Sequence, residues 1–124
     1  MKSIRYTLFL GIIFLLFSNT AFSQRKVLTD EELVSEAVTA EVDAVFKSDD
    51  FLKKKSKKFN DVKGTIVADI GVIQNGKVST FFKVDSDIQN AMFTNFISEY
   101  ILDHKFNFKL QKQQRYKIRY TVTF

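Results

Sequence analysis

Hydrophobic positions change their spacing along the chain, and the first regular spacing lies at residues 29–46. There, apolar residues recur every three or four positions in two neighbouring series, namely Leu33, Ala37, Ala40 and Ala44, and Val34, Val38, Val42 and Val45. This spacing predicts an amphipathic helix. Thr29 and Glu32 fit a capping box at its start, and Leu28 and Leu33 fit a hydrophobic staple.

Residues 64–84 follow a different pattern, which predicts a β-hairpin. Alternate residues from Ile66 to Val72 are apolar, and a second strand is expected at residues 78–84. Asn75 and Gly76 stand between the two strands. Both residue types tolerate the positive φ that a tight hairpin turn requires, so we expect a tight turn at this dipeptide.

The last part of the chain predicts one more helix and one more strand. Ser86 to Gln89 form a second capping-box sequence, and an apolar stripe follows, which predicts a helix over residues 87–103. From residue 115 onward, apolar and polar residues alternate: Tyr116, Ile118, Tyr120, Val122 and Phe124 against Arg115, Lys117, Arg119, Thr121 and Thr123. This alternation is typical of a strand with one buried face and one solvated face.

The predicted order is helix, hairpin, helix and strand, which indicates an α+β fold. We expect a ββαβ unit at residues 63–124, with a small antiparallel sheet covered on one face by helices. Residues 24–62 form the preceding unit, an amphipathic helix and a Lys-rich linker. Residues 47–63 are predominantly polar, and we interpret them as a frayed helix end and a linker.

The N-terminus has the pattern of an export signal. Lys2 and Arg5 precede an apolar run at residues 6–17, and small residues flank Phe22 in Ala21-Phe22-Ser23. The run is shorter than the ~20 residues of a membrane span. We therefore predict a signal peptide at residues 1–23, cleavage after Ser23, and a periplasmic or secreted protein without a stable membrane anchor. An uncleaved anchor is the alternative interpretation.

Composition argues against most enzyme classes and against nucleic-acid binding. The chain has no Cys and one His, and it has no Gly-rich phosphate loop. Loss of Lys2 and Arg5 with the signal peptide lowers the net charge from +5 to +3, which is too small to indicate nucleic acid. We predict a non-catalytic protein without a cofactor or a metal.

Two clusters of polar residues resemble a catalytic site and a cation site, but each has a simpler structural explanation. His104 follows Asp103, with Glu99 about one turn earlier, but a single His at a helix end more often interacts with the helix dipole than catalyses a reaction. Asp85, Ser86 and Asp87 carry oxygen ligands for a cation, but helix capping explains them better than calcium, which needs about 6–8 oxygens.

Five lysines lie in a short run, Lys53, Lys54, Lys55, Lys57 and Lys58. Such a run can attract phosphate or anionic lipid headgroups. A solvated helix end or linker is the interpretation that we favour, because no aromatic residues alternate with the lysines to stack on bases.

An open-edged sheet suggests a binding mechanism. A sheet edge leaves backbone donors and acceptors unpaired, and an extended partner can add to it as a further strand. The last strand or the first hairpin strand is expected to supply this edge. We favour the last strand, with Arg115, Tyr116, Lys117, Ile118, Arg119, Tyr120, Thr121 and Val122 as the peptide-binding residues. The alternative is that its basic and Thr residues only form a solvated surface.

Several segments resemble the C-terminal domain of TonB. Lys63-Gly64-Thr65-Ile66, Asn75-Gly76-Lys77-Val78, the helix ending at His104-Lys105-Phe106, and the last strand follow one another as in that family. His104-Lys105-Phe106 takes the place of the family's W-R-F segment. The resemblance covers about residues 60–124. The chain departs from the family because it has no Pro-rich spacer, and Gln111 to Gln114 stand where the family has a Gly.

The resemblance implies a freestanding exported module without energy transduction. Such a module is expected to bind an extended segment of an envelope protein, such as an outer-membrane transporter, by strand addition. The alternative is a structural envelope protein that self-associates, for example as a homodimer through its sheet edges. A small-molecule carrier is a third hypothesis, which the Phe-rich composition does not favour.

Overall fold

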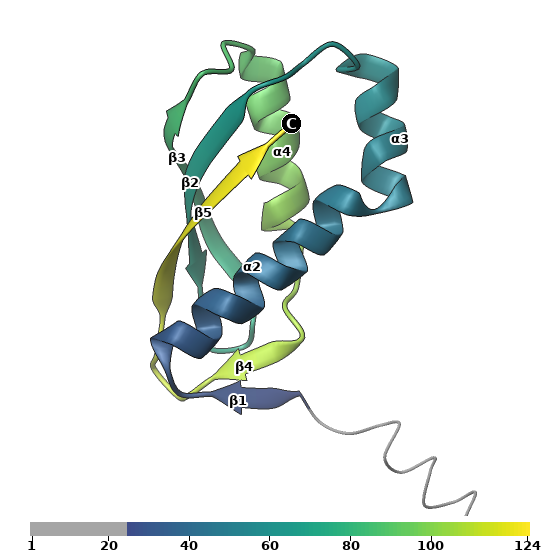
Figure 1. The fold of residues 1–124 in the computed structure, drawn as a ribbon. Helices are drawn as coiled ribbons and strands as arrows, with labels where there is room; N and C mark the ends of the chain where they lie inside the picture. Colours follow the sequence, from purple (N-terminus) through teal and green to yellow (C-terminus); the bar gives the residue numbers. More distant parts are fainter. Residues whose placement is uncertain (1–24) are drawn as a thin grey trace, which may run out of the picture.

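The computed structural model describes residues 25–124 and shows an α+β fold with three helices and a small antiparallel sheet (Figure 1). The predicted signal peptide lies outside the described residues. In chain order the elements are β1 (Lys26–Leu28), α2 (Glu31–Lys47), α3 (Asp49–Lys58), β2 (Thr65–Val72), β3 (Val78–Ser86), α4 (Ala91–Leu102), β4 (Phe108–Leu110) and β5 (Tyr116–Thr123). None of the helices in this part of the chain combines the length and hydropathy needed to cross a bilayer.

The main sheet has the strand order β3-β2-β5, and both pairings are antiparallel. The β2–β5 register runs without interruption from Thr65 opposite Thr123 to Val72 opposite Tyr116. The first hairpin strand, β2, is therefore the central strand. Our expectation that it could supply an open edge is wrong, because it pairs on both sides. The edges of this sheet are β3 and β5.

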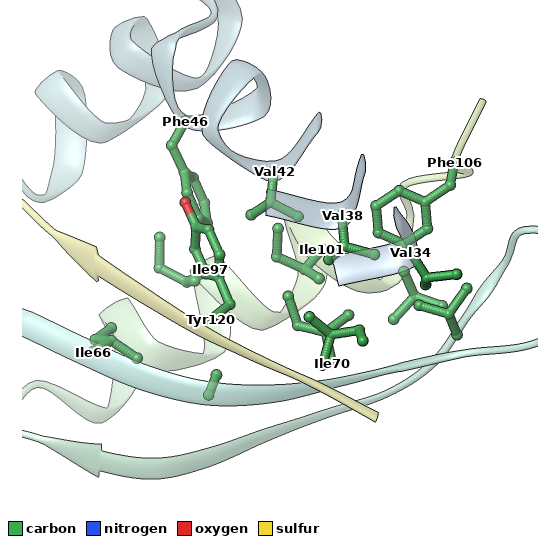
Figure 2. Packing of buried hydrophobic residues seen from close by; sticks show 14 of the residues in the cluster. Val34, Val38, Val42, Phe46, Ile66, Ile70, Ile97, Ile101, Phe106 and Tyr120 are labelled. Carbon is green, nitrogen blue, oxygen red and sulfur yellow. The ribbon is translucent and has the colours of Figure 1, made fainter. Parts of the chain in front are cut away.

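Helices α2 and α4 cover one face of this sheet, as the side chains in Figure 2 show. Val34, Val38 and Val42 on α2 are completely buried, and so is Ile70 on the central strand. The valine series faces the core, whereas Leu33 of the other series is 48% exposed. The predicted alternation of the last strand is confirmed: its apolar side chains are buried or partly buried, and Lys117, Arg119, Thr121 and Thr123 are exposed.

The segment expected to be a linker contains the helix α3. Ser48 ends α2 and begins α3, because its hydroxyl donates to the carbonyl of Val45 and accepts from the N–H of Phe51. The phenyl ring of Phe51 is 1% exposed and lies in the core. Burial of this one ring anchors α3, whose other residues are mostly polar, to the core. The Lys-rich run therefore lies on a helix instead of a flexible linker.

The two predicted capping boxes are replaced by caps at other residues. Asp30 caps α2, and its carboxylate accepts from the N–H of Glu32. Asn90 caps α4 by accepting from the N–H of Phe93, so that helix begins later than expected. The hydroxyl of Ser86 instead accepts from the N–H of Ile88, two residues on, which forms a local turn that competes with helix formation.

The hairpin turn is longer than the tight turn that Asn75-Gly76 predicts. The N–H of Ile73 donates to the carbonyl of Lys77, and the N–H of Gly76 donates back to the carbonyl of Ile73. Of the two turn residues, Gly76 alone has a positive φ, 82°. This is the geometry of a three-residue loop with a glycine bulge, in which Asn75 accepts from the N–H of Lys77 instead of taking the left-handed conformation.

A short parallel pair, β1 with β4, was not predicted. Each strand has three residues, from Lys26 opposite Phe108 to Leu28 opposite Leu110. The guanidinium of Arg25 also donates to the carbonyls of Asn75 and Phe106. These contacts attach the start of the described chain to the hairpin turn and to the segment after α4.

Candidate functional site

Within the part of the chain that the structure describes, the backbone of β5 pairs with another strand on one side only, and the register shows which residues present the other side. Gly64 and Phe124 exchange two hydrogen bonds, with N···O distances of 3.2 and 2.8 Å. In an antiparallel pair, hydrogen-bonded and non-hydrogen-bonded pairs alternate. Pairs that lie an odd number of positions from Gly64–Phe124 are therefore non-hydrogen-bonded. They include the pairs in which Thr121, Arg119 and Lys117 lie opposite Val67, Asp69 and Gly71. Lys117, Arg119 and Thr121 therefore direct their N–H and C=O groups away from β2.

No other strand within residues 25–124 pairs with this outer side of β5. The eight residues predicted to bind peptide divide into two sets. Ile118 and Tyr120 are 3% exposed and use their backbone groups to pair with β2, as the flanking Tyr116 and Val122 also do. The outer edge is presented by the exposed residues Lys117, Arg119 and Thr121, and Arg115 precedes the strand.

A groove of about 410 Å³ runs beside the C-terminal half of β5. Residues 120–124 form one side of it, and the other side comes from the end of α2 and from α3. The helical side is formed by three apolar side chains, two cations and one acid: Phe46, Phe51, Leu52, Lys47, Lys55 and Asp43. We call it the β5 groove. The sequence did not reveal it, because the α3 segment was expected to be a linker.

Tyr120 and Asp43 fix the position of α2 over β5. The phenol of Tyr120 donates a short hydrogen bond to the carboxylate of Asp43, and the two residues lie 77 positions apart in the chain. Burial and this hydrogen bond raise the pKa of the Tyr120 hydroxyl well above its ordinary value. The protonated phenol holds one wall of the β5 groove against the strand.

Arg119 is occupied by an ion pair on the uncovered face of the sheet. Its Nε donates to Oδ1 of Asp69 at 2.7 Å, and Nη2 donates to Oδ2 at 3.3 Å. The hydrogen bond and the charge of Arg119, with a smaller effect of the charge of Lys117, lower the pKa of the Asp69 carboxyl below its usual 3.8. Of the three cations among the predicted peptide-binding residues, Arg115, Lys117 and Arg119, the last is therefore already paired within the chain. Arg115 and Lys117 form no ion pair with the described residues.

Replacing Arg119 by alanine is expected to remove a pH-dependent part of the stability. Because the folded pKa of Asp69 is lowered, its contribution is present above the unfolded value of 3.8 and is lost as the pH falls through the folded pKa. The stability difference between the parent and Arg119→Ala should therefore be largest near neutral pH and shrink in acid. Urea unfolding at pH 7 and below pH 4 measures it. Arg115→Ala, which removes equal charge, is the control, and a pH-independent difference for Arg119→Ala would contradict the expectation.

The catalytic and metal candidates take part in structural contacts. His104 Nε2 lies 3.1 Å from Oε1 of Glu41, and the same carboxylate accepts from the N–H of Asn107. This contact ties α2 to the segment after α4. Asp87 accepts from the N–H of Thr65 at 2.7 Å. Across residues 25–124, no group of three or more His, Cys, Asp or Glu side chains is arranged to hold a metal ion.

Comparison of the chain with protein-family models, with curated proteins and with solved structures finds no match. The outer edge of β5 and its groove are therefore the features that point to a function.

Proposed function

We propose that this chain is an exported peptide-binding module of the TonB C-terminal type. It binds an extended segment of an envelope protein as a fourth strand beside β5. The observation that carries the proposal is the outer edge of β5, where Lys117, Arg119 and Thr121 present backbone groups, together with the groove of about 410 Å³ beside the C-terminal half of the strand. Backbone hydrogen bonds then supply affinity, and the groove accepts side chains from one face of the added strand.

Two features of the fold support the family assignment. The strands of the main sheet and α4 follow the ββαβ order that the resemblance implies, with the three-residue strand β4 added between α4 and β5 and the last strand at the sheet edge. In the loop before β5, Gln113 has a φ of 68°, which glycine adopts at lower cost. A left-handed residue thus lies in the loop where the family has a Gly, although the residue type differs.

The charges beside the edge favour an acidic partner. Lys47 and Lys55 line the β5 groove, Lys117 lies on the strand, and Arg115 directly precedes it. Asp43 is the acid in the groove lining, and it accepts from Tyr120. A partner strand with apolar side chains on its groove-facing side and acidic residues near these cations matches both properties of the surface.

Site-specific photo-crosslinking in the intact envelope tests the proposal. A photoreactive residue at Lys117 lies on the outer edge of β5, and one at Lys83 lies on the opposite edge strand, β3, as the matched control. We expect Lys117 to crosslink to an extended segment of another envelope protein, and Lys83 not to. Crosslinks from Lys117 to this chain alone would favour the self-associating alternative. Crosslinks from Lys83 alone, or from neither position, would overturn the assignment of the edge.

A further inference from the structure

A second groove, of about 490 Å³, lies between α3 and α4. We call it the α3–α4 groove. Its α3 side is formed by Lys54, Lys57 and Lys58, whereas the β5 groove is lined by Phe51, Leu52 and Lys55 of the same helix. The two grooves therefore use different faces of α3.

The floor of the α3–α4 groove is apolar. The rings of Phe59 and Phe96 lie with their centroids 5.1 Å apart, and both side chains line the groove. Met92 at the start of α4 also lines it and is 73% exposed. A methionine this exposed beside two aromatic rings leaves an apolar surface that water covers in the free protein, which is a typical property of a ligand site.

The rim of the groove is strongly basic. The ammonium of Lys54 forms an ion pair with Asp50, with 3.5 Å between Nζ and Oδ2, and it lies 5.5 Å from the centre of the Tyr100 ring. Among the described residues, no carboxylate lies within 4.0 Å of the ammonium groups of Lys57 and Lys58. Glu99 is the acidic residue in the groove lining, so positive charge prevails there.

We infer that the α3–α4 groove binds a single-chain anionic lipid. The acyl chain lies on Phe59, Phe96 and Met92, and the negatively charged head lies between Lys57 and Lys58. A lipid fits better than an extended peptide, because helix backbones hydrogen-bond internally and offer an extended peptide backbone no hydrogen-bond partners. An acyl chain needs none. This inference is independent of the proposed strand addition at β5.

Met92 provides a direct probe of the groove. The chain contains two methionines, Met1 and Met92, so a chain beginning at Gln24 has a single one. Among residues 25–124, all of the buried core residues lie between Val34 and Tyr120, so this chain retains them. With a ¹³C-methyl label on methionine, the NMR spectrum has one protein methyl signal, and it reports from the groove.

The experiment titrates this chain with lysophosphatidylglycerol below its critical micelle concentration. We expect the Met92 methyl signal to shift, and the zwitterionic lysophosphatidylcholine with the same acyl chain to bind about tenfold more weakly. A parallel titration with inorganic phosphate measures how tightly the groove binds the anionic head group without an acyl chain. If phosphate binds as tightly as the lipid, the site is only an anion site and the inference is wrong.

Two variants complete the test. The double variant Lys57→Glu with Lys58→Glu is expected to weaken lysophosphatidylglycerol binding at least about tenfold. Lys53→Glu with Lys83→Glu changes the net charge equally at exposed positions outside the groove and should have a much smaller effect. Met92→Ser should weaken binding about fivefold, measured by calorimetry. An equal loss in both double variants, or no effect of Met92→Ser, would overturn the inference.

Discussion

Replacing Phe51 by alanine is expected to lower the free energy of unfolding by about 3–5 kcal/mol, which is a large part of the stability of a small domain. Phe51 is 1% exposed. Its ring centroid lies 5.0 Å from that of Phe46, 5.5 Å from Phe96 and 5.2 Å from Tyr100. Truncation therefore removes contacts with α2 and α4 together and leaves a cavity that neither helix can close alone.

Urea unfolding followed by circular dichroism measures this effect. A loss of this size lowers the melting temperature by at least about 12 °C. Leu52→Ala is the matched control, because Leu52 is the next residue of α3 and is 50% exposed. It should cost less than about 1 kcal/mol. Similar losses for both variants would show that Phe51 does not anchor α3 to the core.

This helix also shows where sequence patterns fail to predict structure. The valine series of α2 and the alternation of β5 are confirmed, because each has a local period with several apolar residues. In α3 the helix has two apolar residues, Phe51 and Leu52, among five lysines, so no stripe is visible. Its stability depends on burial of Phe51 among rings from distant segments, which local periodicity does not record.

The other differences have local causes. Thr29 and Asp30 are adjacent residues that both favour helix caps, and the backbone geometry selects Asp30. Strands β1 and β4 have three residues each, which is too short for a period to be recognised. The three-residue loop at Gly76 satisfies the same sequence preference as the tight turn, since both need a glycine with positive φ.

Prediction of the candidate site was similarly incomplete. The alternation in β5 correctly separated exposed from buried side chains, because a strand has a period of two. Which backbone groups face outward depends on the register with β2, and that register is a tertiary property. The pairing of Arg119 with Asp69 across 50 residues, and the wall that α3 supplies to the β5 groove, also required the fold.

Replacing Thr121 by proline is expected to weaken partner binding at least about tenfold if the partner adds as a strand to β5. Proline removes an N–H that points away from β2, so the β2–β5 hydrogen bonds remain intact. Thr121 also lines the β5 groove, where the proline ring would obstruct an incoming strand. Thr121 is a better position than Arg119, because a substitution of Arg119 also breaks its ion pair with Asp69.

The matched control is Thr121→Ala, which removes the side chain but keeps the N–H. It should bind the partner with nearly the parent affinity, and both variants should retain the parent circular dichroism spectrum and unfold cooperatively. Affinity is measured with the segment that Lys117 crosslinks, supplied as a synthetic peptide. Equal binding by a folded Thr121→Pro variant would show that the partner does not pair with β5. Equal weakening by both variants would show that the partner contacts the threonine side chain and does not hydrogen-bond to this strand edge.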